Sequence, residues 1–286
     1  IQILNWNRAQ DTQRAIKSAL NQTYSNIEIV MVDNGSTDNS IALTKANYPN
    51  IKIVALDKNY GCPGGRNLGI SHCCGEFIFY LDNDGVLHKE AVQNAYNTVM
   101  SEENVGVVTG VIYDFYDESE IDANCNFKSL ERYESHVFNG GISMHKKSIY
   151  DDVGFYPKHF MYGYEETYLS LKLSDTSHKI IEDCSVVLWH IGSNTARDRS
   201  KEILSGYFNK LYTAFSLYPF SKLAPFFFYF LLKYPGYAKK EGIAKQFWLK
   251  FRNDFFSTIR MGIEDRNPIS SEAILRFNKL SNHVLG

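Results

Sequence analysis

Residues 77–84 read Phe77-Ile78-Phe79-Tyr80-Leu81-Asp82-Asn83-Asp84, a run of five apolar residues followed by two carboxylates. A short apolar run of this kind is typical of a strand that is buried on both faces, as in a parallel sheet. Two Asp side chains two residues apart, just past such a strand, offer the oxygen ligands that Mg²⁺ takes together with substrate phosphates. The sequence Asp-Asn-Asp-Gly also suits a solvated turn, so this stretch alone leaves both interpretations open.

Strand and helix patterns alternate on both sides of this stretch. Strands are predicted at residues 1–4, 27–32, 51–55 and 105–112, and helices at 11–20, from 40, at 66–71 and at 89–100. This alternation predicts an α/β protein whose mostly parallel sheet is covered by helices on both faces. Ligands of such sheets bind at the carboxyl ends of the strands. Polar clusters fall at three of these ends, namely Asp33, residues 58–67 and residues 82–84.

The alternation loosens after about residue 113. Residues 114–134 are acidic and irregular, and strands at 137–144 and 180–189 flank a helix at 164–173. From residue 199 only helical patterns occur, with breaks expected at Pro219, Pro225, Pro235 and Pro268. We therefore expect an α/β domain over residues 1–198 and a helical C-terminal region over residues 199–286.

The composition excludes several classes of protein. The chain has 286 residues, 44% hydrophobic and 22% charged, which is ordinary for a globular protein. Its net charge of −2 argues against a general nucleic-acid binder, which needs a basic surface. Five cysteines without zinc-like spacing predict reduced thiols and a cytoplasmic protein. The chain opens on a strand-like segment, so no signal peptide is expected.

Three further groups of residues are candidates for chemistry. Residues 61–67 form a glycine-rich loop at a helix start, which suits close approach of a ligand but matches neither a dinucleotide fingerprint nor a Walker loop. Hydride transfer with a dinucleotide is therefore disfavoured. Glu165 and Glu166, after an aromatic run, suit a general base or simply complement a helix dipole. His190, at the end of a strand, suits a third metal ligand or a structural role.

Taken together, the motifs resemble glycosyltransferase family 2, which has the GT-A fold. The resemblance covers roughly residues 1–195 and rests on the order of its motifs. These are Asn5-Trp6-Asn7-Arg8, residues 18–24, residues 29–38, Asn59-Tyr60-Gly61, residues 64–70 and residues 75–84. It implies a Rossmann-like, mostly parallel sheet flanked by helices.

The resemblance also implies roles for individual residues. Those matching the nucleotide-binding positions are Asn5, Arg8, Asp33, Arg66, Asn67 and Asp82. Those matching the site of Mg²⁺ or Mn²⁺ are Asp84, Asp82 and His190. Those matching the sugar and acceptor region are Gly140, Gly141, Tyr164 and Trp189. Glu166 aligns with the catalytic base, with Glu165 as the next candidate.

The chain departs from the family at two of these positions. The family usually has Glu-Asp where this chain has Glu165-Glu166, and often an acidic residue where Tyr168 stands. Residues 189–193 are similar to a segment of bacterial rhamnosyltransferase-like and galactofuranosyltransferase-like members.

The activity that the resemblance implies is inverting, metal-dependent transfer of a sugar. The expected donor is a UDP- or dTDP-linked sugar, and the expected acceptor is a glycan or a lipid-linked glycan in surface polysaccharide synthesis. The alternative is a non-catalytic protein of the same fold that binds nucleotide sugars.

The C-terminal third combines positive charge with aromatic residues. Residues 222–260 hold eight basic and two acidic residues, a net charge of +6, and include the apolar run 225–232. This run is far shorter than the roughly 20 residues that span a bilayer. It suits a helix lying in the membrane interface, on the inner face of the cell membrane, or one packed on the catalytic domain or in a homodimer.

Overall fold

The computed structural model describes residues 1–115, 131–191 and 198–284. Its strands are β1 (Gln2–Asn5), β2 (Val30–Asp33), β3 (Lys52–Ala55), β4 (Phe77–Asp82), β5 (Gly85–Leu87), β6 (Val105–Phe115), β7 (Arg132–Ser135), β8 (Ile142–Lys146) and β9 (Lys179–Ile191). Its helices are α1 (Ala9–Leu20), α2 (Ser40–Asn47), α3 (Gly61–Ile70), α4 (Ala91–Val99), α6 (Ile149–Val153), α7 (Glu165–Leu173), α8 (Arg199–Leu217), α9 (Phe220–Lys240), α10 (Ala244–Glu264) and α11 (Ser271–Val284).

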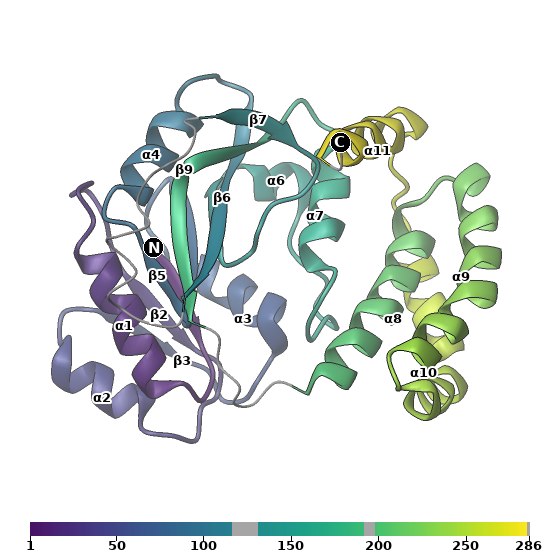
Figure 1. The fold of residues 1–286 in the computed structure, drawn as a ribbon, viewed down its shortest axis with the longest axis horizontal. Helices are drawn as coiled ribbons and strands as arrows, with labels where there is room; N and C mark the ends of the chain where they lie inside the picture. The colour runs from purple at the N-terminus through teal and green to yellow at the C-terminus, as the bar shows by residue number, and fades with distance from the viewer. Residues whose placement is uncertain (116–130, 192–197, 285–286) are drawn as a thin grey trace.

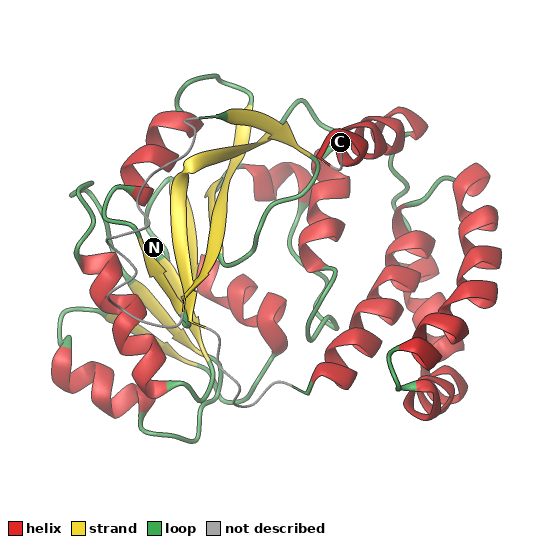
Figure 2. Ribbon diagram, viewed as in Figure 1, coloured by secondary structure: helices red, strands yellow, loops and turns green. Residues whose placement is uncertain are grey.

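One sheet forms the centre of the N-terminal part, with helices on both of its faces (Figure 2). The strand order is β3-β2-β1-β4-β8-β6-β9-β5, and β7 also pairs with β9. The strands β3, β2, β1 and β4 run parallel to one another, and β6 is parallel to β9. Strand β8 runs antiparallel to both β4 and β6. The predicted α/β sheet flanked by helices is confirmed.

Alternate residues of the strands pack on opposite faces of this sheet. On β4, Phe79 and Leu81 join a cluster with α1 and α4, while Ile78 and Tyr80 join a cluster with α3, α6 and α7. A strand buried on both faces needs apolar residues at successive positions, which explains the unbroken run in β4. Of the polar residues that follow this run, Asp82 and Asn83 are partly exposed and Asp84 is buried.

The predicted strand at residues 137–144 is wrong in its bounds. The structure has β7 before it and β8 at its end, with Asn139, Gly140 and Gly141 in the turn between them. The N–H of Ile142 donates to the carbonyl of Asn139, and the N–H of Asp82 donates to the carbonyl of Gly141. The two glycines thus belong to a turn against the end of β4. Most of the acidic segment 114–134 lies outside the described residues, as do Cys125 and Gly192-Ser193.

Helices α8 to α11 form the C-terminal part, on the side of the molecule away from β3 (Figure 1). Side chains of α8, α9 and α10 share one hydrophobic cluster, and a second cluster joins α8 and α11 to α7. The predicted breaks at Pro219 and Pro268 are confirmed, but α9 continues through Pro225 and Pro235. Each internal proline removes one helical hydrogen bond, and here tertiary packing of the helix outweighs that loss. No helix within the described ranges is both long and apolar enough to cross a bilayer.

Candidate functional site

A cleft of about 480 Å³ lies at the carboxyl ends of β1 and β4. Its walls come from the loops after β1, β2 and β4, from the start of α3, and from the starts of α7 and α8. The lining residues are Leu4, Trp6, Arg8, Asn34, Asn59, Gly61, Cys62, Arg66, Asp82, Asn83, Asp84, Met161, Tyr162, Gly163, Glu165, Glu166, Asp198, Lys201 and Glu202. The sequence predicted a site at this edge of the sheet, because strand ends in α/β proteins gather polar side chains there.

Arg66 is the central cation of the cleft. It lies on α3 and is buried, although it is charged. Its Nη2 donates to Oδ1 of Asp82 at 2.8 Å, and its Nη1 lies 3.8 Å from Oε1 of Glu166. A buried guanidinium needs anionic partners, and this one joins the end of β4 to the start of α7. The predicted nucleotide residue Arg66 and the predicted base Glu166 are therefore neighbours.

Gly140 and Gly141 leave room for these charged groups. A Cβ atom built on Gly140 would lie 2.4 Å from both Nη1 of Arg66 and Oε1 of Glu166. A Cβ atom on Gly141 would lie 2.5 Å from Oδ2 of Asp82. Neither glycine lines the cleft itself, but both border the ion pairs that do. Any side chain at these positions would displace the carboxylates.

Asp84 is buried and meets two cationic partners. It forms an ion pair with Arg8, and its Oδ2 lies 3.4 Å from Nε2 of His190. The other ring nitrogen of His190 lies 2.9 Å from Oδ1 of Asp114. Hydrogen bonding to Asp84, with a smaller effect from Asp114, raises the pKa of His190 to about 9 although burial opposes the shift.

Two of the three predicted metal ligands, Asp84 and His190, thus lie together. The third, Asp82, is held by Arg66. No group of three His, Cys, Asp or Glu side chains arranged to hold a metal occurs within residues 1–115, 131–191 and 198–284. Carboxylate and imidazole donors at one point fit Mn²⁺ or Mg²⁺ in their chemistry, with other ligands to come from substrate phosphates.

Asn5 and Asp33 lie behind the wall of the cleft. Asn5 donates to Oδ2 of Asp33 at 2.8 Å, and the N–H of Ser36 donates to Oδ1 of Asp33 at 2.9 Å. Oδ1 of Asn5 accepts hydrogen bonds from Thr12 and Asn83. Both predicted nucleotide residues are buried and tie the loops after β1, β2 and β4 to one another.

Asn67, Trp189 and Tyr164 lie outside the lining of the cleft. Asn67 exchanges hydrogen bonds with the backbone of Tyr156. Trp189 is buried against the ring of His88. Tyr164 has a positive φ of 72° immediately before α7, which orients the start of that helix. The structure brings these residues to the border of the site without placing them in its wall.

Glu165 and Glu166 begin α7 and face the cleft. Burial, followed by the charge of Glu166, raises the pKa of Glu165 to about 8. Burial also raises the pKa of Glu166, while the nearby Arg66 guanidinium opposes that shift. Oε2 of Glu165 is buried and has no hydrogen-bond partner among the described residues. A carboxyl with a raised pKa can exchange a proton near neutral pH, as a general base must.

Several residues of the cleft were missed by the sequence predictions. Asn34 donates to the carbonyl of Gly61 at 2.9 Å and fixes the loop before α3. Lys201 and Glu202 reach the cleft from the first turn of α8, and Asp198 caps that helix by accepting from the N–H of Lys201. The only signal for α8 was a helical pattern beginning near residue 199. Nothing in that pattern indicated that its first turn faces the cleft.

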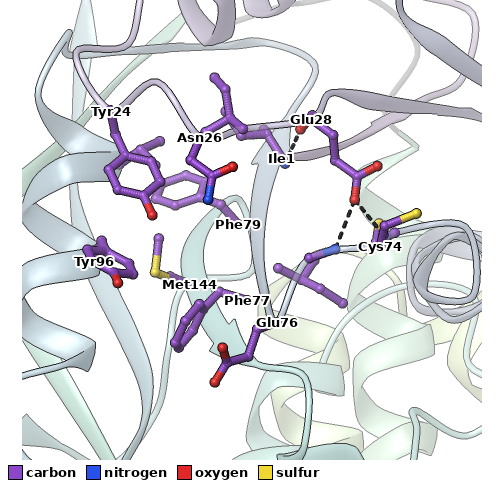
Figure 3. A pocket seen from close by; sticks show the side chains of 15 residues that line it. Ile1, Tyr24, Asn26, Glu28, Cys74, Glu76, Phe77, Phe79, Tyr96 and Met144 are labelled. Carbon is purple, nitrogen blue, oxygen red and sulfur yellow. Dashed lines mark hydrogen bonds between the residues drawn. The ribbon is translucent and has the colours of Figure 1, made fainter.

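A second cavity, also of about 480 Å³, lies at the opposite edge of the sheet. Figure 3 shows the side chains of Tyr24, Phe77, Tyr96 and Glu28 around it, where β1 and β4 begin. Glu28 accepts hydrogen bonds from the backbone N–H groups of Cys74 and Gly75 there. None of the predicted site residues lines this cavity.

The family model "Glycosyl transferase family 2" matches residues 1–167 of the chain. The chain belongs to this family. Its GT-A-like fold, with a helical C-terminal region, agrees with the expectation drawn from the motifs. The matched range contains the whole polar edge of the sheet from β1 to β4 and the start of α7.

Curated glycosyltransferases resemble the chain over part of their length. Glycosyltransferase GlyG of Streptococcus pneumoniae is 33% identical over 118 residues, which are 40% of this chain and 38% of that protein. The cholesterol galactosyltransferase of Borreliella burgdorferi is 30% identical over 138 residues, 47% of this chain and 37% of that one. The matched part spans about one to two fifths of the curated relatives compared.

Solved glycosyltransferase structures share the fold. The mannosyltransferase PcManGT of Pyrobaculum calidifontis, in complex with GDP-Man and Mn²⁺, covers 98% of this chain and 86% of its own, with a TM-score of 0.57 and 15% identity. GalNAc-T7 with UDP, GalNAc and Mn²⁺ covers 90% of this chain and 56% of its own, with a TM-score of 0.64 and 14% identity. At such identities the likeness shows the fold alone.

Proposed function

We propose that the chain is an inverting glycosyltransferase that moves a sugar from a nucleotide sugar to a hydroxyl of a glycan or lipid-linked glycan. The observation that carries this proposal is the chain of charges from Asp82 through Arg66 to Glu166 along one cleft. Asp84 and His190 lie at the same edge of the sheet. The family match supports the class of reaction.

Each charged group has a task in the proposed reaction. Glu166 accepts the proton of the acceptor hydroxyl, whose oxygen attacks the anomeric carbon while the bond to the nucleotide diphosphate breaks. Arg66 orients Glu166 and keeps part of its population ionised. Asp84 and His190 would hold a divalent cation, and Asp82, which Arg66 holds in this structure, is the third proposed ligand. The cation would neutralise charge on the leaving diphosphate. Arg8, now paired with Asp84, supplies a further positive charge at this point.

The segment that contains Trp189 and His190 favours a rhamnosyl or galactofuranosyl donor carried by dTDP or UDP. We place the catalytic domain at residues 1–198 and the helical region at residues 199–286, although Lys201 and Glu202 also line the cleft. The free thiols of Cys62, Cys73 and Cys74 support a cytoplasmic location.

The decisive experiment compares transfer with donor binding in the Glu166→Gln variant. Sugar transfer from a panel of UDP- and dTDP-sugars with Mn²⁺ should fall by at least about a hundredfold, because the amide cannot accept the proton. The rise in melting temperature produced by UDP or dTDP should persist, because the base does not hold the nucleotide.

The Glu165→Gln variant is the comparison that assigns the base. Full transfer activity in Glu166→Gln together with its loss in Glu165→Gln would move the role to Glu165. Nucleotide binding by the wild-type chain without transfer to any acceptor tested, or to water, would favour the non-catalytic alternative.

A further inference from the structure

Helix α9 has one buried side and one exposed apolar side. Phe230, Tyr234 and Ala238 face inward, where they pack in the cluster shared with α8 and α10. On the other side, Phe228 is 63% exposed and Leu232 is 77% exposed. In Figure 1, α9 lies at the end of the molecule opposite the sheet. Apolar side chains on both sides of a surface helix exceed what its own core requires.

Lysines flank the exposed apolar side of α9. Lys222, Lys233 and Lys240 are spaced by 11 and 7 residues, so at about 100° per residue they share one line along the helix. This line lies about a quarter turn from Leu232 and about a third of a turn from Phe228. We call these five residues the α9 surface.

The positive charge at this end is largely uncompensated. Within the described chain, Lys250 and Arg260 pair with Asp254 and Glu264 of the same helix. Six other basic residues of α9 and α10 have no carboxylate within 4.0 Å among the described residues. They are Lys222, Lys233, Lys239, Lys240, Lys245 and Arg252.

Helix α10 repeats the pattern at the same end of the molecule. Leu249, Phe256 and Ile263 are spaced by seven residues and are all exposed, while Phe247 and Phe255 face the shared cluster. Seven residues are close to two helical turns, so the exposed residues form a stripe along the helix.

We propose that the α9 surface docks on an anionic lipid bilayer, with α9 lying in the plane of the interface. Aromatic and aliphatic side chains enter the boundary between headgroups and acyl chains, and the flanking lysines contact anionic headgroups. A bilayer fits better than a second copy of the chain, because two such surfaces would bring uncompensated positive charges together. The docking site is separate from the cleft and does not depend on the proposed reaction.

Sedimentation with lipid vesicles tests this proposal. At low salt the whole chain should pellet with vesicles of equal parts phosphatidylglycerol and phosphatidylcholine, but not with pure phosphatidylcholine. The variant Lys222→Glu/Lys233→Glu/Lys240→Glu should lower the partition coefficient at least about tenfold. Phe228→Ser/Leu232→Ser, which keeps every charge, should lower it too and leave a weaker, more salt-sensitive association.

A matched control carries the same charge change on the sheet side of the molecule. Lys17→Glu/Lys45→Glu/Lys89→Glu should bind vesicles as the wild type does, since these exposed lysines lie on or beside α1, α2 and α4. Equal binding by the control and the α9 charge variant would overturn the proposal, as would wild-type protein that stays in the supernatant. The proposal would also be overturned if sedimentation velocity without lipid showed a dimer of the wild-type chain and the Phe228→Ser/Leu232→Ser variant were monomeric. Melting temperatures of all variants establish that each is folded.

Discussion

Arg66, Glu166 and Asp82 can be held close together because Gly140 and Gly141 have no side chains. The guanidinium of Arg66 is buried and cannot move aside freely, and Glu166 approaches it across the space next to Gly140. A glycine is required here by close approach of other groups rather than by an unusual φ angle. The spacing of charges in the cleft therefore depends on two residues that carry none.

The variant Gly140→Ala tests this dependence. The added methyl group would displace Arg66 or Glu166, and a misplacement of about 1 Å in a catalytic group can lower kcat by about a hundredfold. Steady-state kinetics measure this effect. Gly206→Ala, in α8, is the control. A Cβ atom added at Gly206 would meet no atom within 4 Å outside the backbone of its own helix, so this variant should leave kcat unchanged. A Gly140→Ala enzyme with wild-type kcat would contradict the packing argument.

Glu165 gives a prediction about stability and pH. Its folded-state pKa of about 8 exceeds its ordinary value, so the folded state binds the proton more tightly than the unfolded state. The stability that this proton provides is fully present below the ordinary Glu pKa and is lost as pH rises through the folded value. Glu165→Gln should therefore raise the melting temperature at pH 9 and change it much less at pH 5.

Thermal melts of Glu165→Gln across this pH range are the measurement. Glu103→Gln serves as the control, because Glu103 is exposed and lies away from the cleft. Equal shifts for Glu165→Gln at both pH values would show that Glu165 does not change its protonation state between them, which would contradict a folded-state pKa of about 8.

At the scale of the element, α8 joins the cleft to the helical part. Its first turn lines the cleft through Lys201 and Glu202, and Phe208 and Leu211 further along belong to the cluster shared with α9 and α10. The start of this helix is fixed by Asp198, whose Oδ1 accepts from the N–H of Lys201 at 3.2 Å. The cap thus determines where two lining residues begin.

Removal of this cap should affect both stability and substrate binding. Asp198→Ala should lower the melting temperature by about 2–4 °C, because a free N–H at the helix start loses its acceptor. It should also raise KM for the donor more than it lowers kcat, since Lys201 and Glu202 line the cleft from α8 whereas the proposed base Glu166 lies on α7. Asp198→Asn keeps a capping oxygen and should retain most of the stability. Equal losses in the two variants would point to the charge of Asp198 rather than to the cap.

At the scale of the whole molecule, periodicity and strand ends predicted the architecture. The apolar run of β4 and the polar residues after β2, β3 and β4 were enough to place a site at one edge of the sheet. Contacts between residues far apart in the chain could not be predicted from periodicity and strand ends. Three features depend on segments that are far apart in the chain. They are the ion pair between Arg8 and Asp84, the burial of Asp33, and the position of the first turn of α8 at the cleft.

The turn at Gly140 shows that local structure, too, was not always predictable from the sequence pattern. The sequence pattern favoured one strand over residues 137–144, because apolar residues surround the two glycines. Packing against Arg66 and Asp82 decides the structure instead, since only a turn without side chains fits between these groups. Local propensity gave way to a tertiary contact that no nearby residue signals.

Within α8, Lys201 and Phe208 are seven residues apart, which is about 10 Å along the helix axis. Because a helix of this length moves as a rigid rod, the orientation of α9 and α10 is mechanically tied to the mouth of the cleft. Anchoring one end of that rod would set the height and tilt at which the opening meets an incoming hydroxyl group. The reach of the enzyme, and hence which positions of a tethered acceptor it modifies, would then be governed by a helix that carries no catalytic group.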